Sequence, residues 1–302
     1  MILIVGGTGF VGKNLVLSLS KRGSALRVVS RNPDTEFLSK HAPEVQSLTL
    51  AQLMSDPKAA LLDVTTVVYL ASTSVPTANL ECPWREARDT VETTMRMISA
   101  VAKHSSANVI YLSSGGAIYG DLPVERIKEQ DELRPISPYG LGKKMTEAAL
   151  DFMARTQGLK VTVLRPSNPI GRWQVNVSQG VVGAMMRAAR KDTIFPMFGE
   201  GAAVRDYFDI RDLSAAIELI LDQPELCFGR TWNVGSGTGI SVQEILKMVQ
   251  EVSGREIRVN RLPARPADVA RTVLDTAAIQ AELGWRPRYE LRGSLHDIWK
   301  VT

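Results

Sequence analysis

Short runs of apolar, mostly β-branched residues recur through the first half of the chain, separated by segments with helical periodicity. Uninterrupted apolar runs of this length are typical of strands buried on both faces of a parallel sheet. The runs that predict strands are Ile2–Val5, Leu26–Ser30, Thr66–Ala71, Asn108–Leu112 and Lys160–Arg165. The segments that predict helices are 13–19, 89–104 and 139–156. This alternation predicts an α/β fold with a doubly wound parallel sheet.

The pattern loosens after Pro166, where glycine, proline and scattered arginine replace the regular alternation. We find no internal repeat, low-complexity tract or evident linker between the two parts. A chain of 302 residues is long enough for one large domain or two moderate ones with a sizeable core. We therefore expect a first domain built on the parallel sheet and a smaller C-terminal α/β lobe packed on it.

A glycine-rich turn lies between the first predicted strand and the first predicted helix. Gly6, Gly9 and Gly12 follow the spacing Gly-x-x-Gly-x-x-Gly directly after Ile2–Val5. Glycines permit a tight turn and a close approach of the backbone to a pyrophosphate, which the helix N-terminus then stabilises. Such a motif alone has many false matches and can be a purely structural turn. Its place between strand and helix favours a dinucleotide-binding Rossmann domain.

The second strand ends at Ser30 and Arg31, where a carboxylate normally binds the adenosine ribose of NAD. An arginine near this point can pair with the 2′-phosphate of NADP instead. The alternative is that Arg31 stacks on adenine or faces solvent. The residues therefore allow NAD or NADP as the cofactor and slightly favour NADP.

Tyr139 and Lys143 are four residues apart in a predicted helix, so their side chains share one face. An ammonium beside a phenol is expected to lower the phenol pKa from roughly 10, which lets it exchange a proton with a substrate hydroxyl near neutral pH. By itself this spacing more often belongs to a solvated helix face. The glycine turn and two serines at a strand end, Ser113 and Ser114, favour the catalytic interpretation.

Composition argues against several other classes of function. Two cysteines, Cys82 and Cys227, offer neither a disulfide framework nor metal-ligand spacing, and three histidines are too scattered for a metal site. The net charge of +4 is modest and spread along the chain, which suits an anionic small molecule better than nucleic acid. No apolar run approaches membrane-spanning length and the N-terminus has no signal-peptide pattern, so we expect a cytoplasmic enzyme without a metal or a membrane partner.

Motifs along nearly the whole chain resemble those of the extended short-chain dehydrogenase/reductases. Within that family their order is most similar to the nucleotide-sugar epimerases of the UDP-glucose 4-epimerase type, among the NAD-dependent epimerase/dehydratases. The motifs that carry the resemblance are Gly6–Gly12, Ser113–Gly120, Ser137–Lys143, Leu164–Gly171, Val204–Asp212, Trp232–Gly237, Arg265–Asp268 and Leu283–Pro287. The resemblance implies a dinucleotide-binding Rossmann domain over 1–168 plus about 209–236, and a nucleotide-sugar-binding lobe over 169–208 plus 237–302.

The resemblance implies catalytic roles for Ser114, Tyr139 and Lys143. Tyr139 would be the acid/base, Lys143 would bind the nicotinamide ribose and lower the tyrosine pKa, and Ser114 would hydrogen-bond the reacting hydroxyl. Without the longer Gly-Gly form of this loop, the hydroxyl position falls on Gly115, and Ser113 remains the second candidate. The cofactor contacts expected from the resemblance are Gly6, Gly9, Phe10, Val11, Gly12, Arg31, Ala71, Lys143 and Pro166.

The resemblance also implies a nucleotide-diphosphate site in the C-terminal lobe. Arg205 and Arg265 would bind the phosphates, since planar guanidinium groups bind phosphate oxygens bidentately. Asp268 would bind the ribose, Asn168 would approach the phosphates or the sugar, and Phe198 would contact the base. From the residues alone, a surface salt bridge explains either arginine equally well, and Phe198 fits a core position better.

The implied reaction is an epimerisation of a nucleotide sugar, expected to be UDP-linked, through a keto-sugar. Tyr139 takes the proton of a ring hydroxyl while hydride leaves the same carbon, and return of hydride to the other face inverts that carbon. Gly115 and Gly116 stand where sugar 4,6-dehydratases carry an Asp-Glu pair, which disfavours dehydration. No histidine lies between His104 and His296, which argues against the chemistry of GDP-fucose-synthase-like enzymes.

Two alternatives stay open. An NADPH-dependent keto-sugar reductase needs no further groups, and Arg31 favours it. A non-catalytic cofactor sensor is disfavoured because such proteins typically lose the tyrosine or the lysine. Two departures matter, since Ser30 and Thr90 stand where the family has an aspartate and an asparagine. The resemblance further implies a homodimer formed through the helices at 89–104 and 139–156.

Overall fold

The computed structural model describes residues 1–302 except 76–80, 175–179, 266–268 and 302. The chain divides into two compact units. The first comprises Met1–Ser114, Ser137–Arg165 and Ala216–Trp232, and the second comprises Gly115–Ile136, Pro166–Ala215 and Asn233–Thr302. The division expected from the sequence differs from these units mainly at residues 115–136 and 209–215, which group with the second unit.

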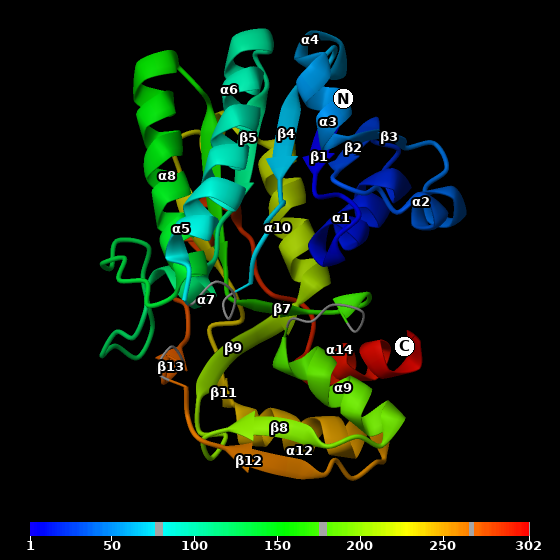
Figure 1. The fold of residues 1–302 in the computed structure, drawn as a ribbon, viewed down its shortest axis with the longest axis vertical. Coiled ribbons are helices and arrows are strands. Elements are labelled where there is room, and N and C mark those ends of the chain that lie inside the picture. The colour runs from blue at the N-terminus through cyan, green and yellow to red at the C-terminus, as the bar shows by residue number, and fades with distance from the viewer. Residues whose placement is uncertain (76–80, 175–179, 266–268, 302) are drawn as a thin grey trace. The chain divides into compact units, whose positions relative to one another are not determined.

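A parallel sheet of seven strands organises the first unit (Figure 1). Its strands are β1 (Ile2–Val5), β2 (Leu26–Ser30), β3 (Gln46–Thr49), β4 (Thr66–Tyr69), β5 (Asn108–Leu112), β6 (Val161–Pro166) and β10 (Thr231–Val234). Their spatial order is β10-β6-β5-β4-β1-β2-β3, with parallel pairing at each step from β6 to β3. Strand order reverses between β1 and β4, which confirms the predicted doubly wound fold.

Helices flank this sheet (Figure 1). They are α1 (Phe10–Lys21), α2 (Thr35–His41), α3 (Leu50–Ser55), α4 (Pro57–Ala60), α5 (Pro83–Glu86), η1 (Ala87–Glu92), α6 (Thr93–His104), α8 (Pro138–Gln157), α10 (Ile210–Asp222), which is shared between the units, and α11 (Pro224–Cys227). The helix predicted at 89–104 begins earlier than expected, because the π-helical segment η1 precedes α6. Short π-helical segments are frequent at functional sites.

The core of the first unit lies between the sheet and its helices. Val67 of β4 and Tyr111 of β5 pack in one cluster with Met97 of α6 and Leu150 of α8. Burying each such side chain contributes about 1.5–3 kcal/mol to folding. Met95 of α6 is 37% exposed, because Met97 and its neighbours occupy the face that meets the sheet.

The second unit contains shorter strands and its own core. Its strands are β7 (Asn168–Ile170), β8 (Phe195–Phe198), β9 (Val204–Asp209), β11 (Gly239–Ser241), β12 (Val259–Leu262) and β13 (Arg271–Thr272). Its helices are α7 (Gly115–Ile118), α9 (Val181–Lys191), α12 (Val242–Ser253), α13 (Ala277–Leu283) and α14 (Leu291–Val301). Strand β9 pairs in parallel with β7 and β13 and antiparallel with β11, and β8 pairs in parallel with β12. Met186, Tyr207 and Ile245 join helices α9 and α12 to β9 in one apolar cluster.

Membrane-spanning helices and metal-binding clusters are both absent from the described residues, those outside 76–80, 175–179, 266–268 and 302. Within them, no helix combines the length and apolar character that crossing a bilayer requires. The same ranges contain no group of three or more His, Cys, Asp or Glu side chains arranged to hold a metal ion.

Candidate active site

The glycine turn after β1 is packed too closely for side chains at two of its positions. Gly6 has φ +87°, and a Cβ added there would lie 2.9 Å from the backbone nitrogen of Ala71. A Cβ on Gly12 would lie 2.3 Å from the carbonyl oxygen of Gly6 and 2.5 Å from the backbone of Gly7. The turn, the start of α1 and the end of β4 therefore approach one another through backbone atoms, as glycine alone allows.

The N-terminus of α1 is suited to bind a diphosphate. Its N-cap, Gly9, supplies no side-chain hydrogen bond, and the first turn carries no acidic residue. Phe10 and Val11, which open the helix, are half-buried. The first N–H groups of the helix thus lack a side-chain acceptor, and the helix dipole adds a positive partial charge. The expected residues of this turn therefore fit a dinucleotide pyrophosphate.

The end of β2 presents hydroxyls and a cation where a carboxylate was the usual expectation. Thr8 Oγ1 donates to Ser30 Oγ at 2.9 Å and ties the glycine turn to β2. Arg31 is exposed. One carboxylate, that of Asp34, follows in this segment. It pairs with Lys13 of α1 at 2.5 Å, and this contact lowers the pKa of Asp34. The polar groups at this end are thus of both charge signs.

The start of α8 places Tyr139 in its first turn. Ser137 is the N-cap, its side chain accepts a backbone N–H of the first turn, and Pro138 opens the helix. Lys143, one turn later, is 3% exposed, and its Nζ donates to the carbonyl oxygen of Leu112 at 2.8 Å. The Nζ lies 5.6 Å from the centroid of the Tyr139 ring. The two side chains therefore share one face of α8 at the carboxyl end of β5.

Burial dominates the protonation of this pair. It raises the pKa of Tyr139 to about 12, partly opposed by a hydrogen bond with Ser114 and reinforced by the negative charge of Glu86. Burial lowers the pKa of Lys143 to about 8, against the attraction of Glu147 and Glu86. The expectation that Lys143 lowers the tyrosine pKa is therefore wrong for this structure. Desolvation of the phenolate is the largest of the effects on this tyrosine.

The serine loop after β5 separates the two serine candidates. Ser114 is the one that hydrogen-bonds Tyr139. Ser113 is 3% exposed, and its Oγ has no hydrogen-bond partner among the described residues. Gly115 begins α7. The structure thus brings Ser114, Tyr139 and Lys143 together within the first unit.

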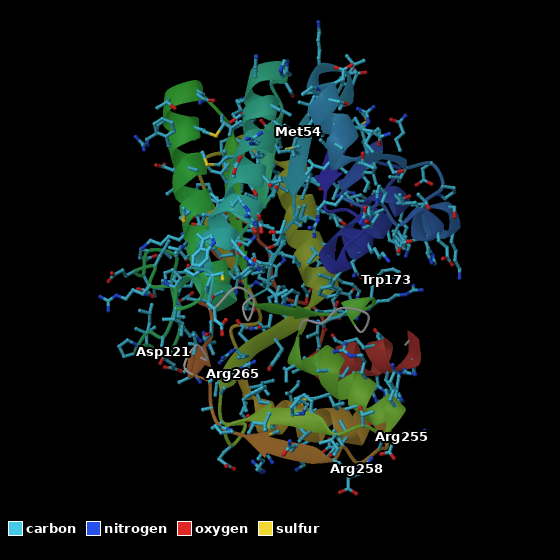
Figure 2. All side chains as sticks on the ribbon, in the orientation of Figure 1. Met54, Asp121, Trp173, Arg255, Arg258 and Arg265 are labelled. Carbon is cyan, nitrogen blue, oxygen red and sulfur yellow. The ribbon has the colours of Figure 1, made fainter. Side chains whose placement is uncertain are left out.

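Two of the predicted substrate residues in the second unit contact each other. The guanidinium of Arg265, which is labelled in Figure 2, lies 4.0 Å from the ring centroid of Phe198, at the end of β8. Phe198 is half-buried, so the arginine covers a face of the ring that the core does not. Asp268 lies outside the described residues. An arginine held on an aromatic face keeps its N–H fork directed sideways and suited to planar anions.

Two further predicted substrate residues, Arg205 and Asn168, lie on strand β9 and on its parallel neighbour β7. Asn168 opens β7, and its Nδ2 donates to the carbonyl oxygen of Asp206 at 3.3 Å. Arg205 is half-buried, and its guanidinium donates to the carbonyl oxygen of Val204 at 2.8 Å. Both side chains thus belong to adjacent strands of one small sheet.

Sequence reasoning missed the acid next to Arg205. Asp206 is fully buried, and its carboxylate accepts from the N–H and hydroxyl of Ser236 at 2.8 and 2.6 Å. It also accepts from the backbone N–H groups of Gly237 at 3.2 Å and Leu274 at 3.3 Å. Burial still raises the pKa of Asp206. The carboxylate ties two chain segments, one at Ser236 and Gly237 and one at Leu274, to β9, which holds Arg205 in place.

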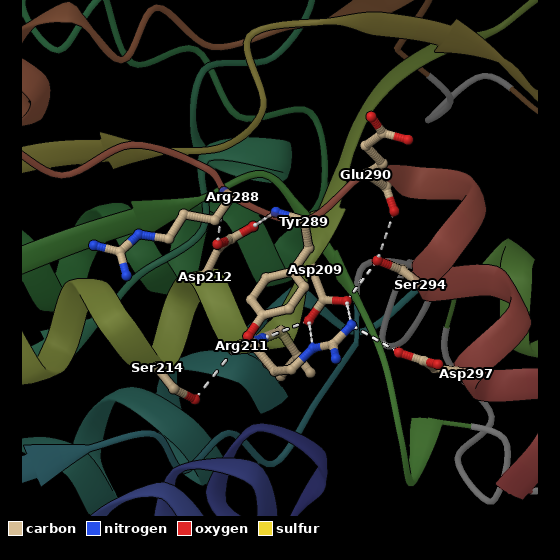
Figure 3. A network of polar contacts seen from close by, with 10 residues as sticks. Asp209, Arg211, Asp212, Ser214, Arg288, Tyr289, Glu290, Ser294 and Asp297 are labelled. Atoms are coloured by element: carbon tan, nitrogen blue, oxygen red, sulfur yellow. Dashed lines mark hydrogen bonds and ion pairs between the residues drawn. The ribbon is translucent and has the colours of Figure 1, made fainter.

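The remaining acids of the Val204–Asp212 motif serve the fold in the same way (Figure 3). Asp209 binds the guanidinium of Arg211 at 2.7 Å, and the same guanidinium lies 3.7 Å from the ring centroid of Tyr289. Asp212 accepts the backbone N–H groups of Arg288 at 2.9 Å and Tyr289 at 3.3 Å. The three-residue spacing of these acids was a signal that could have indicated their shared structural role.

The π-helical segment η1 contains the departure from the family asparagine. Thr90 is buried, and its hydroxyl forms a hydrogen bond with the hydroxyl of Thr73. Thr94 Oγ1 donates to the carbonyl oxygen of Thr90 at 2.7 Å. Glu86, just before η1, is buried as well and was not singled out from the sequence. It lies in a polar stretch, so no local pattern distinguishes it from an exposed residue.

The chain is similar to known proteins over almost its whole length. The model of the NAD dependent epimerase/dehydratase family matches residues 2–235. The UDP-glucose 4-epimerase of Corynebacterium glutamicum is 29% identical over 318 residues, which span 100% of this chain and 95% of that protein. The UDP-glucose 4-epimerase of Thermotoga maritima, solved with UDP-glucose, is 29% identical with a TM-score of 0.90, covering 99% of this chain and 97% of the other. That of Thermus thermophilus, solved in complex with NAD, is 27% identical with a TM-score of 0.90, covering 99% and 98%. The chain belongs to the NAD-dependent epimerase/dehydratase family.

Proposed function

We propose that the protein is a nucleotide-sugar 4-epimerase that acts on UDP-linked hexoses through a keto-sugar, with a tightly held nicotinamide cofactor. The observation that carries this proposal is the grouping of Ser114, Tyr139 and Lys143 in the same unit as the glycine turn, at the carboxyl ends of β5 and β1. The named substrates of the similar proteins, UDP-glucose among them, support the substrate class.

Tyr139 is proposed as the group that moves the proton of the sugar hydroxyl. A nicotinamide cofactor held at the glycine turn would supply the hydride transfer, from the sugar carbon and back to its other face. Ser114 hydrogen-bonds the reacting oxygen, and Lys143 binds the nicotinamide ribose. With its pKa raised to about 12 the phenol of Tyr139 is protonated, which is the form that gives a proton to the keto oxygen as hydride returns. The forward step requires added positive charge near the phenol to stabilise the phenolate.

The second unit is proposed to bind the nucleotide diphosphate. Arg205 and Arg265 would take the phosphate oxygens, and charge-assisted bidentate bonds of this kind are stronger than neutral ones. Phe198, already stacked with Arg265, would contact the base, and Asn168 would reach the phosphates or the sugar. Asp268 is proposed for the ribose on the family pattern alone.

The cofactor is proposed to be NAD or NADP, held by the glycine turn together with Ala71 and Pro166 at the ends of β4 and β6. The similar protein of Thermus thermophilus was solved with NAD, which supports NAD. Arg31 and the hydroxyl of Ser30 keep NADP open, since an exposed arginine can meet a 2′-phosphate. The identity of the dinucleotide released on heat denaturation decides between them.

We also propose a homodimer formed through α6 and α8, in the cytoplasm, where nucleotide sugars and nicotinamide dinucleotides are metabolised. Met95 of α6 and Leu141, Met145 and Phe152 of α8 are exposed apolar side chains on these two helices. Exposed apolar surface of this kind favours association. Light scattering at micromolar concentration is expected to give twice the mass of one chain, and a single-chain mass would contradict the proposal.

Incubation of the purified protein with UDP-glucose, without added cofactor, tests the proposed reaction. Conversion to the C4 epimer, with the retained cofactor unchanged in amount, is the expected result. Stoichiometric consumption of added NADPH on a UDP-keto-sugar, without interconversion of C4 epimers, would instead establish the keto-sugar reductase.

A further inference from the structure

A buried carboxylate stands unpaired beside the tyrosine and the lysine. Glu86, the last residue of α5, is 2% exposed. Neither of its carboxylate oxygens has a hydrogen-bond partner among the described residues. Glutamates are almost never fully buried unless they are paired, because a carboxylate loses its hydration on burial. A buried carboxylate without a donor requires an explanation.

Gly142 of α8 makes room for this carboxylate. A Cβ on residue 142 would lie 2.6 Å from Glu86 Cγ and 2.9 Å from Glu86 Oε1. Glycine in a helix interior destabilises the helix relative to alanine. The helix nevertheless carries glycine at this position, between Tyr139 and Lys143. The carboxylate of Glu86 therefore lies against the backbone of the turn that carries both site residues.

Lys143, the residue after Gly142, is a buried cation of the same helical turn. Its Nζ donates to Leu112, and the rings of Tyr111 and Tyr139 lie 4.9 and 5.6 Å away. No carboxylate of the described residues lies within ion-pair distance of Lys143. The negative charges of Glu147 and, after it, of Glu86 oppose the effect of burial on the lysine pKa.

The other charged side chains around this turn are mostly paired with a side chain of opposite charge. Glu147, one turn along α8, is bound by Arg165 of β6 at 2.6 Å. Arg88 and Asp89 of η1 pair with each other at the surface. Tyr69 of β4 hydrogen-bonds Thr94, and its ring packs on Tyr111. Among the described residues around this turn, Glu86 is left as the buried carboxylate that has no ion-pair or hydrogen-bond partner.

We propose that Glu86 is the counter-ion of Lys143, a positioning residue that keeps the lysine in its ammonium form, and that Gly142 is the glycine that admits it to α8. The inference rests on the proposed function only for its catalytic meaning, because the charge state of Lys143 is a property of the folded chain. An ammonium at this position would hold the nicotinamide ribose. Loss of the Glu86 charge therefore narrows the pH range in which Lys143 is protonated.

A titration of Lys143 tests the proposal without substrate or cofactor. The protein is labelled with lysine carrying ¹³C at Cε, and the Lys143 signal is assigned by its loss in Lys143→Arg. Glu86→Gln is expected to lower the Lys143 midpoint by about one pH unit, the smaller end of the range for a nearby opposite charge. Glu86→Asp, which retains the charge, is expected to keep the midpoint closer to that of the unmodified protein.

Two further variants separate charge from structure. Gly142→Ala pushes the carboxylate away from α8 without removing it. This variant is expected to lower the Lys143 midpoint, as Glu86→Gln does. Glu92→Gln removes an exposed glutamate of η1 that pairs with Arg96, and is expected to leave the midpoint unchanged. Circular dichroism verifies that each variant is folded.

An unchanged Lys143 midpoint in folded Glu86→Gln would overturn the proposal. So would an equal shift in Glu92→Gln, because it would show that the effect is not specific to the buried carboxylate. A protein that passes this titration but interconverts no UDP-sugars refutes the proposed function and leaves the counter-ion intact. If the epimerase is active, the basic limb of its kcat/KM profile is expected to move to lower pH in Glu86→Gln.

Discussion

Replacing Gly12 by alanine tests the packing of the glycine turn directly. The added Cβ would lie 2.3 Å from Gly6 O and 2.5 Å from two backbone atoms of Gly7. Backbone atoms cannot rotate away as a side chain can, so the turn itself has to move. Overpacking costs about 1–3 kcal/mol, and the backbone contacts place this case at the upper end. The higher helix propensity of alanine offsets about 1 kcal/mol of this cost, so the free energy of unfolding falls by about 2 kcal/mol.

Urea unfolding of the whole chain measures this loss. The free energy of unfolding of Gly12→Ala is expected to fall by about 2 kcal/mol with an unchanged m-value, because the variant alters packing and not the surface exposed on unfolding. The amount of dinucleotide retained after purification is expected to fall with it, since the same turn carries the N–H groups at the start of α1.

Gly293→Ala is the matched control. Gly293 lies in α14, is exposed, and has no atom within 4 Å of an added Cβ. The same change is therefore expected to stabilise the chain by up to about 1 kcal/mol. If Gly12→Ala is as stable as the unmodified protein and retains the same amount of dinucleotide, the turn does not have the close packing described above.

Three more predictions address the site and its support. Tyr139→Phe is expected to lower kcat about 10²–10⁴-fold, the range for loss of an acid/base group, with little change in the urea midpoint; full activity would remove Tyr139 from the chemistry. Asp206→Ala leaves the donors of Ser236, Gly237 and Leu274 without their acceptor. At about 1–3 kcal/mol per unpaired group, the free energy of unfolding is expected to fall by at least about 3 kcal/mol. A fall of less than about 1 kcal/mol in urea unfolding would contradict this. Burial lowers the pKa of Lys143 from 10.5 to about 8, so between these values the unfolded chain binds more protons and the lysine's contribution to stability rises with pH. Unfolding at pH 8 and 9.5 is expected to show that Lys143→Met lacks this rise, and an identical slope in both proteins would refute the shift.

The first unit was predictable where its strands are buried on both faces, and β3, whose residues are exposed or half-buried, was not predicted. The predicted and observed bounds agree for three strands, β1 (Ile2–Val5), β2 (Leu26–Ser30) and β5 (Asn108–Leu112). Continuous apolar runs of this kind leave little choice of structure. The second unit was not resolved into elements, because β7, β11 and β13 are two or three residues long and their burial depends on tertiary contacts.

The candidate site was predictable where its residues are close in sequence. Tyr139 and Lys143 share a helical face, and the glycine turn follows directly from β1 to α1. The sign of the Tyr139 pKa shift was not predictable, because it depends on how deeply the fold buries the phenol. Glu86 was missed for the same reason, since its burial and its contact with Gly142 join segments more than fifty residues apart along the printed sequence.

Transfer of a deuterium label within one sugar tests the central claim most directly. UDP-glucose deuterated at C4 is incubated with the purified protein without added cofactor, and the product is analysed by mass spectrometry and NMR. Hydride chemistry beside Tyr139 and Lys143 predicts a C4 epimer that retains deuterium at C4, because the label leaves and returns at the same carbon. An epimer that carries hydrogen at C4, or no epimer at all, would contradict the account.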